Sequence, residues 1–113
     1  MSSIITIKNS KEIKYILKKG NKFYTKHLIF LYQKNSLGFP RFSFIVSKKI
    51  SKKAIVRNRI KRIIKEAIRL NFGKLKDLPF DIVIIAKKGL ENKKTYHLFE
   101  DMILFSKHLK GKL

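Results

Sequence analysis

The chain has 113 residues, the size of one ordinary domain, and 44% of them are apolar, including nine Phe and four Tyr. That content excludes a disordered basic tail, so the sequence predicts one folded domain over residues 1–113. Against seven acids stand 28 Lys and Arg, and a net charge of +21 repels itself in a compact body unless a polyanion offsets it. The charge indicates a nucleic acid or an anionic membrane as partner.

Several kinds of site are excluded by what the sequence lacks. There is no Cys, which excludes disulfides, thiolate nucleophiles and Cys-based zinc sites. No run approaches the roughly 18 apolar residues of a membrane span, so we expect a soluble, cytoplasmic protein. The three His do not show the i, i+4 spacing that brings two imidazoles to one helix face, so we expect no metal site on the protein.

The first half of the chain predicts a helix followed by two strands. Apolar residues at helical spacing between Asn9 and Gly20 predict a helix over 10–19. Aromatic and β-branched residues predict a strand over 28–33, and strict alternation predicts another over 41–47. Asn, Ser, Gly and Pro between them are typical of a turn, so we expect these two strands to form a hairpin.

The second half predicts a helix, a strand and a helix. The longest helical pattern covers 54–72 and ends before Gly73. An unbroken apolar run over 81–86 predicts a strand that is covered on both faces. After a Lys-Lys-Gly turn, an apolar stripe predicts a last helix over about 94–109. The expected order is α-β-β-α-β-α, without a repeat or a linker to a second domain.

The helix over 54–72 has two faces of opposite chemistry. The side that we expect to pack in the core carries Val56, Ile60, Ile63, Ile64, Ala67 and Leu70. The other side is polar and cationic, and carries Asn58, Lys61, Arg62, Lys65 and Arg69. Arg57 and Arg59 fall near the two borders, where a long side chain can swing its guanidinium outward.

A solvated helix face is the simplest interpretation of these charges, but it fits the segment poorly. From Lys48 to Arg69 ten basic residues accompany one acid, Glu66, whereas a face built for solubility usually mixes signs. Lysines at positions 48, 49, 52 and 53 also lie near the helix start, where the helix dipole disfavours cations. Because helix N-termini attract phosphate, the segment predicts docking of a sugar-phosphate backbone.

The same residues carry a resemblance to a known family. The signature of the bacterial ribonuclease P protein components closely resembles two blocks of this chain, Ser47-Lys48-Lys49-Ile50 and Arg57-Asn58-Arg59-Ile60-Lys61-Arg62-Ile63-Ile64-Lys65-Glu66-Ala67. The resemblance extends to the first helix that ends at Gly20, the strands near Arg41 and Asp81, and the length. It therefore covers essentially the whole chain.

The resemblance implies a small mixed α+β fold, an α/β sandwich of the element order given above, which is also found in a domain of a ribosomal protein. It implies that two parallel strands are joined through the basic helix by a left-handed βαβ crossover. Periodicity alone favours the right-handed crossover that nearly all such units show. The left-handed form is the expectation taken from the family.

The resemblance further implies that the chain is one subunit of a ribonucleoprotein whose catalytic subunit is RNA. Such an enzyme uses magnesium ions, held mainly by the RNA, to remove the 5′ leader from precursor tRNA. The expected partners are ribonuclease P RNA and precursor tRNA, with no membrane and no protein partner required. No cofactor is expected on the protein alone.

Carried over by position, the family motif implies a surface that contacts the catalytic RNA or the substrate near its cleavage site. The motif assigns Arg57, Asn58, Arg59, Lys61 and Arg62 to this surface, and Lys48 and Lys49 would extend it. The other basic residues of the same segment complete the expected RNA-binding set: Lys52, Lys53, Lys65 and Arg69. The family also lines a cleft for the single-stranded leader, between the first helix, the central helix and the sheet. Beside Lys61 and Lys65, this cleft would be lined by Ile13, Leu17, Phe30, Leu31, Tyr32 and Phe44.

Two positions in that cleft depart from the family pattern. Phenylalanine is common where this chain has Ile13 and Leu17, which cannot stack on a base. Either van der Waals contact and charge hold the leader, or Tyr15, Phe30 or Tyr32 supplies the ring. Equally, Ile13, Leu17 and Phe30 are interpretable as core residues.

The acids of the chain do not suggest catalysis by the protein itself. Phosphodiester cleavage by a protein needs a carboxylate cluster for metals, or a general acid and base close to the phosphate. Glu66 is flanked by Lys65 and Arg69, and the Glu100-Asp101 pair is interpreted as solvent-side charge. We expect no catalytic residue in this chain, and expect its positive charge to offset the repulsion between two RNAs.

Two other functions fit part of the sequence. A ribosomal protein that only binds rRNA would match in size and charge, but it leaves the Ser-Lys-Lys and Arg-Asn-Arg blocks unexplained. A protein of membrane surfaces would need bulky residues at the border of the basic helix, whereas the apolar stripe there is Val, Ile and Ala. The subunit of an RNA enzyme is the preferred prediction.

Overall fold

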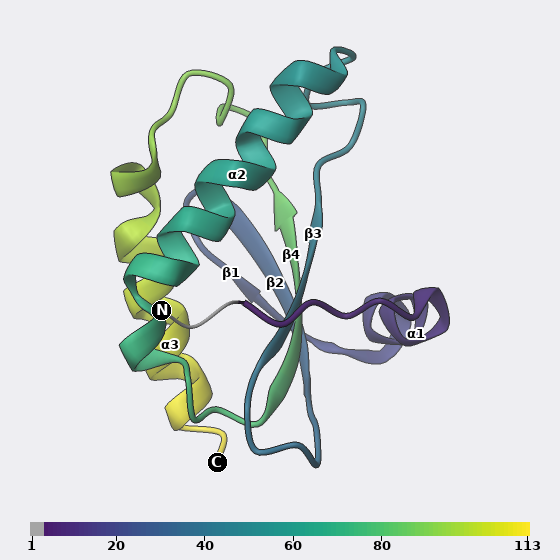
Figure 1. Cartoon of the computed structure of the whole chain (residues 1–113), viewed down its shortest axis with the longest axis vertical. Coiled ribbons are helices and arrows are strands. Elements are labelled where there is room, and N and C mark those ends of the chain that lie inside the picture. The colour runs from purple at the N-terminus through teal and green to yellow at the C-terminus, as the bar shows by residue number, and fades with distance from the viewer. Residues whose placement is uncertain (1–3) are drawn as a thin grey trace.

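The computed structural model describes residues 4–113, which form a four-stranded sheet with helices on both faces (Figure 1). The helices are α1 (Ser10–Lys19), α2 (Ala54–Leu70) and α3 (Phe99–Lys110). The strands are β1 (Asn21–Tyr24), β2 (Leu28–Lys34), β3 (Arg41–Ile45) and β4 (Phe80–Ala86), and two 3-10 helices are η1 (Phe72–Lys74) and η2 (Thr95–Leu98). The mixed α/β class is as expected, and β1 is an additional strand.

Helix α1 has the bounds that its capping residues predict. The Oδ1 atom of Asn9 accepts hydrogen bonds from the backbone N–H groups of Lys11 at 2.8 Å and Glu12 at 3.4 Å. At the other end the N–H of Gly20 donates to the carbonyl oxygen of Ile16 at 2.7 Å. A Cβ atom at position 20 would lie 2.5 Å from that oxygen, so only glycine fits the stop of this helix.

The predicted hairpin between β2 and β3 is wrong. The sheet order is β1-β2-β4-β3, so β4 lies between these two strands, antiparallel to β2 and parallel to β3. The hairpin partner of β2 is β1, and the N–H of Thr25 donates to the carbonyl of Leu28 at 2.9 Å in the turn between them. Because β4 is apolar on both faces, its burial is greatest at the centre of the sheet, and it displaces the sequence-adjacent pairing.

The parallel strands β3 and β4 are joined through α2, as the resemblance implies. Phe42 aligns with Ile82, and Phe44 with Ile84. In Figure 1 both strands run upward, α2 lies to their left, and β3 is nearer the viewer than β4. Seen from the helix side, the chain therefore moves from right to left, which is a left-handed crossover.

The two faces of the sheet are covered by different helices. Helices α2 and α3 pack on one face and α1 packs on the other, which places α1 and α2 on opposite sides of the molecule (Figure 1). Ile82, Val83 and Ile84 of β4 are fully buried, so the prediction of a strand covered on both faces is confirmed. The main core lies beneath α2 and α3, and a smaller cluster lies beneath α1.

The inward stripe of α2 differs from its prediction at the C-terminal end. Ile60, Ile64 and Ala67 are fully buried, but Leu70 is 53% exposed, so its predicted place in the core is wrong. Ile68 is buried instead, because it follows Ile64 by four residues and continues the stripe at helical pitch. The helix also ends at Leu70 rather than at residue 72, and η1 follows it.

The last predicted helix is divided in two. Residues 95–98 form the 3-10 helix η2, and α3 begins only at Phe99. Asp101 was expected on the solvent side, but its exposed fraction is 2%, so that interpretation is wrong. Its carboxylate is buried because it accepts hydrogen bonds from Thr25 and His27 in the β1-β2 turn.

An aromatic cluster ties α3 to the sheet and makes stability depend on pH. The hydroxyl of Tyr32 lies 2.6 Å from Nε2 of His108, and the ring of Phe23 stacks on this imidazole at 4.2 Å. Burial, and then the charge of Lys112, lower the pKa of His108, whereas burial raises the pKa of Tyr32. Tyr32 therefore stays protonated and donates to a neutral imidazole.

We expect the free energy of unfolding to fall when the pH is lowered from 7.5 to 5.5. Because the folded-state pKa of His108 is lowered, the unfolded chain binds the extra proton first, and stability is lost as the pH falls below about 6.5. His108→Gln keeps a partner for Tyr32 but does not titrate, so urea denaturation should show a weaker pH dependence in this variant. An unchanged dependence would assign the effect to other groups.

Candidate nucleic-acid interface

The start of α2 presents unpaired backbone donors among lysines. Lys53 is the N-cap and makes no side-chain capping bond, and the first turn contains no acid. The lysines at 48, 49, 52 and 53 are all exposed on the loop that leads from β3 into the helix. Since the N–H groups of a first helical turn attract anions, this end of α2 favours a phosphate group.

Arg57 closes that loop rather than pointing freely outward. Its Nη1 donates to the carbonyl oxygens of Ser51 at 3.0 Å and Lys52 at 2.9 Å. The loop is also held by the hydroxyl of Ser51, which accepts from the N–H of Lys53 at 3.2 Å. Arg57 therefore fixes the backbone that bears the exposed lysines.

Arg59 holds a second loop on the other side of α2. Its Nη1 donates to the carbonyl oxygen of Glu91 at 3.0 Å, and its Nη2 donates to that of Lys93 at 2.9 Å. These carbonyls belong to the segment between β4 and η2. The Arg59 guanidinium was predicted to point outward, but it donates two hydrogen bonds to the segment between β4 and η2 and so positions that loop. We call this pair of bonds the Arg59 clamp.

The exposed face of α2 carries the remaining predicted residues. Asn58, Arg62 and Lys65 are exposed and Lys61 is half-buried. The ammonium of Lys65 lies 5.5 Å from the ring centroid of Phe44, which steadies it over the edge of β3. We call the following set the basic α2 surface: Lys48, Lys49, Lys52, Lys53, Asn58, Lys61, Arg62 and Lys65.

Sequence reasoning missed one apolar member of this face. Ile55 is 82% exposed, in the first turn of α2 and among the lysines. Its helical spacing to Asn58 and Arg62 could have revealed it, because positions i+3 and i+7 share a face. An exposed β-branched side chain beside cations can contact a base or a ribose.

Arg69 lies at the far end of α2 in an ion pair with Glu66. Its Nε and Nη2 both donate to the Glu66 carboxylate, with 3.0 Å for the Nη2 bond. Hydrogen bonding from Arg69 lowers the pKa of Glu66. This partner makes Arg69 a weaker candidate for phosphate contact than Arg62.

Replacing Arg59 with Lys should separate positioning from charge. We expect Arg59→Lys to lower the free energy of unfolding by about 1–2 kcal/mol, because an ammonium cannot span both carbonyls. It should also speed amide hydrogen exchange in segment 87–94. Arg62→Lys, the matched control on the same helix, should change stability by less than about 0.5 kcal/mol. Equal effects of the two variants in urea denaturation would refute the clamp.

The residues of the predicted leader cleft lie on two faces of the sheet. Ile13, Leu17 and Leu31 belong to the cluster under α1. Phe30, Tyr32 and Phe44 belong to the opposite cluster under α2 and α3. The prediction of one cleft lined by all six residues is therefore wrong. The reason is the period of a strand, in which Phe30 and Leu31 point to opposite faces.

Phe30 and Tyr32 are core residues in this structure. The exposed fraction of Phe30 is 0%, and its ring stacks on Phe105 at a centroid distance of 3.9 Å. Tyr32 is buried with its hydroxyl on His108. Neither ring can reach a base without unpacking α3.

The face beside α1 does present a half-buried apolar row. Ile29, Ile85 and Ile45 align across β2, β4 and β3, and all three are partly buried. Tyr24 of β1 aligns with Ile29 at the end of this row and is 58% exposed. Sequence reasoning missed Tyr24 because β1 was not predicted, and without the strand its face could not be assigned.

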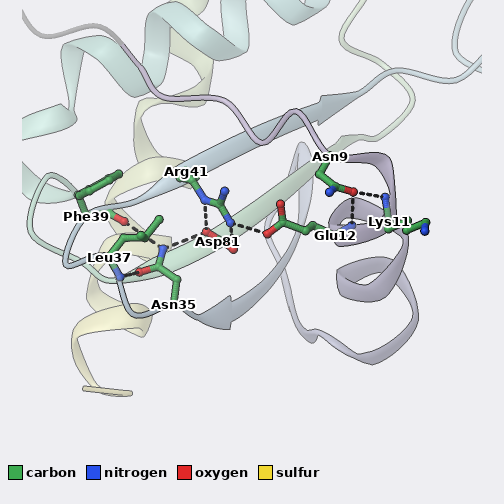
Figure 2. A network of polar contacts seen from close by, with 8 residues as sticks. All are labelled: Asn9, Lys11, Glu12, Asn35, Leu37, Phe39, Arg41 and Asp81. Carbon is green, nitrogen blue, oxygen red and sulfur yellow. Dashed lines mark hydrogen bonds and ion pairs between the residues drawn. The ribbon is translucent and has the colours of Figure 1, made fainter.

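A polar network fixes α1 on this face, as Figure 2 shows. The guanidinium of Arg41 donates to Asp81 from Nε at 2.8 Å and from Nη2 at 2.6 Å, and Nη2 also lies 2.8 Å from Oε2 of Glu12 in α1. Asn35 donates to the same Asp81 carboxylate at 2.9 Å. The network links the helix to the two parallel strands.

Ionisation of Asp81 is set by this network. Burial opposes the charged form, but hydrogen bonds from Arg41 and Asn35 outweigh burial and lower the pKa of Asp81. Hydrogen bonds to Asp81, and then to Glu12, raise the pKa of Arg41. The carboxylate and the guanidinium are therefore both charged at neutral pH.

Residues 4–113 lack two other kinds of feature. Within this range, His, Asp and Glu side chains form no group of three that could hold a metal ion. None of the helices described there combines the length and the apolar character that crossing a membrane requires.

Comparison with known proteins places this chain beside one group. A family model described as Ribonuclease P matches residues 1–110. The ribonuclease P protein component of Fusobacterium nucleatum is 46% identical over 83 residues, which cover 74% of this chain and 73% of that protein. The protein of the same name from Rickettsia canadensis is 39% identical over 109 residues, which cover 88% and 92%.

Solved structures agree with the sequence relatives. The RNase P protein from Thermotoga maritima superposes with a TM-score of 0.79 at 26% identity, covering 91% of this chain and 96% of that one. The RNase P protein of Staphylococcus aureus superposes with a TM-score of 0.74 at 24% identity, covering 89% and 91%, which shows likeness of fold.

Proposed function

The chain belongs to the ribonuclease P family, and from this premise we propose that it binds both the catalytic RNA and the 5′ leader of precursor tRNA. As a ribonuclease P protein component it has a role in processing the 5′ end of tRNA. In our proposal the RNA subunit performs the cleavage, and this chain supplies binding and charge.

The observation that carries the proposal is the basic α2 surface, which lies between two loops that Arg57 and Arg59 hold in place. Arg57 and Arg59 donate to backbone carbonyls, so the backbone segments on both sides of α2, including the loop that bears Lys52, are held in place before RNA arrives. A backbone that is already positioned loses less conformational entropy on binding. The surface therefore suits the folded catalytic RNA, whose phosphates are also fixed.

We propose that the leader binds along the apolar row beside α1. Tyr24 supplies the exposed ring on which a base can stack, while the isoleucines of the row contact ribose and base edges. The row reaches β3 at Ile45, two residues before the lysine-bearing loop begins at Ser47. A strand of RNA leaving the apolar row would thus meet the lysines at the start of α2.

In our proposal the magnesium ions are bound by the RNA and not by this chain. High cation density on the protein lowers the repulsion between catalytic RNA and substrate, so fewer magnesium ions are needed to bring them together. The protein contributes no metal ligand in this scheme. Its effect should be largest when magnesium is scarce.

The proposal is tested by cleavage of precursor tRNA at low magnesium. Three mixtures are compared, with the protein alone, with a bacterial ribonuclease P RNA alone, and with both. We expect no cleavage by the protein, slow cleavage by the RNA, and a large gain when both are present. Cleavage by the protein alone, or no gain from adding it, would reject the proposal.

A further inference from the structure

A pocket that is separate from the basic α2 surface lies where the β1-β2 turn meets η2 and the start of α3. It is lined by Lys26, His27, Lys93, His97, Glu100, Asp101 and Leu104. Two histidines, two lysines and two acids thus line one pocket, although they come from segments far apart in the chain. Neither the family motif nor the proposed function uses any of these side chains.

The buried carboxylate of Asp101 fixes the position of His27 in the pocket wall. One of its oxygens accepts from the hydroxyl of Thr25 and, at 3.0 Å, from the backbone N–H of His27, and the other lies 3.0 Å from Nδ1 of His27. Because both oxygens of this buried carboxylate are acceptors, Nδ1 of His27 carries a hydrogen. Nε2 is then the free ring nitrogen, an acceptor when the ring is neutral.

His97 has the opposite arrangement. Its Nδ1 accepts from the backbone N–H of Lys94 at 2.9 Å, so the hydrogen of the neutral ring is on Nε2. Its ring lies against that of Tyr96 at a centroid distance of 4.3 Å. The two histidines therefore offer different groups, an acceptor from His27 and a donor from His97.

This combination matches a ribose-phosphate unit. The acceptor of His27 suits a 2′-hydroxyl, and the donor of His97 with the two ammonium groups suits the adjoining phosphate. Leu104 on the pocket wall is 45% exposed and the neighbouring Tyr96 is 61% exposed, which leaves apolar surface for a base. Glu100 and Asp101 are the lining carboxylates, and both oppose an anion. The Asp101 carboxylate is buried and its oxygens are occupied by hydrogen bonds from Thr25 and His27, whereas Glu100 is exposed.

We propose that this pocket binds one ribose-phosphate unit of an RNA strand, recognised by His27 and His97. It is an additional contact beyond the proposed function, because its residues lie outside both the basic α2 surface and the apolar row beside α1. An RNA bound on α2 could extend to it across the loop that Arg59 clamps, since that loop includes Lys93.

The test follows the imidazole ¹⁵N signals of the full chain during titration with uridylyl-3′,5′-uridine, with its 2′-deoxy counterpart and with inorganic phosphate. His27→Asn and His97→Asn are the informative variants, because an asparagine amide can reproduce the Nδ1 bond while removing Nε2. Glu100→Gln removes the opposing charge. A variant with Lys61, Arg62 and Lys65 changed to Ala separates this pocket from the proposed function.

We expect the ribodinucleotide to shift both imidazoles and to bind more tightly than the other two probes. Each His variant should abolish saturable binding at the remaining ring, Glu100→Gln should tighten binding about two- to fivefold, and the α2 variant should leave the shifts intact. The proposal is overturned if Glu100→Gln binds no better, if phosphate or the deoxy probe binds equally well, or if the α2 variant loses the shifts.

Discussion

Asp81→Asn is expected to lower the free energy of unfolding by about 3 kcal/mol, the usual cost of leaving one partner of a buried ion pair without the other. Asp81 is 3% exposed and receives both arms of Arg41 as well as Asn35. The variant removes the charge that holds the guanidinium between β3, β4 and α1. Urea denaturation at neutral pH measures the loss.

The pH dependence of the same variant has a definite sign. Because the folded-state pKa of Asp81 is lowered, its contribution is complete above the unfolded value of about 3.9 and is lost as the pH falls through the folded value. The stabilities of the two proteins should therefore converge in acid. Asp77→Asn, at an exposed carboxylate, is the matched control and should cost less than about 0.5 kcal/mol. Equal losses in the two variants would contradict the account of the network.

Changing Lys61, Arg62 and Lys65 together to Ala should weaken binding to ribonuclease P RNA about a hundredfold, on the basis of about 1 kcal/mol for each charge-assisted contact. Alanine favours helix, so α2 should keep its structure. Each lost phosphate contact lowers the slope of log affinity against log salt by about 0.7–0.9, so the slope should fall by about two units. Filter binding at several salt concentrations measures both quantities.

A second triple variant controls for total charge. Lys107, Lys110 and Lys112 are exposed near the C-terminus, away from the basic α2 surface, and changing them to Ala removes the same charge. This variant should lose much less affinity and keep most of the slope. If both triple variants behave alike, binding depends on net charge and not on the α2 surface.

The elements with local signals were predictable from sequence. The Asn9 cap and Gly20 stop gave α1 its bounds, and the apolar run in β4 indicated a strand covered on both faces. Strand β1 was missed because Asn-Lys-Phe-Tyr contains too few apolar or branched residues to mark a strand. It forms because β2 would otherwise expose a free edge, and that is a tertiary effect.

The order of the strands, and the sheet face to which each side chain points, were harder to predict from the sequence. Turn residues after Lys34 favour a reversal, but they do not say which strand the returning chain pairs with, and β4 took the place that β3 was expected to fill. The prediction of the leader cleft was wrong because it did not take account of which sheet face each residue points to. Once α1 and α2 cover opposite faces, Phe30 and Leu31 cannot line the same surface.

The candidate interface was predictable as a charged face but not in its internal bonding. Arg57 and Arg59 donate to backbone carbonyls of other segments, and a carbonyl acceptor has no sequence signal because every residue has one. The charge of the segment and the family motif therefore indicated RNA contacts for its four arginines, whereas the structure gives Arg57 and Arg59 a positioning role. Arg62 is the arginine of the motif that is left for the RNA.

Cleavage stimulation by the two triple variants tests the central claim most directly. Precursor tRNA and ribonuclease P RNA are incubated at low magnesium with the wild-type chain, with the variant of Lys61, Arg62 and Lys65, or with the variant of Lys107, Lys110 and Lys112. We predict strong stimulation by the wild type and by the C-terminal variant, and little by the α2 variant. Equal stimulation by both variants would contradict the claim that the protein acts through the basic α2 surface.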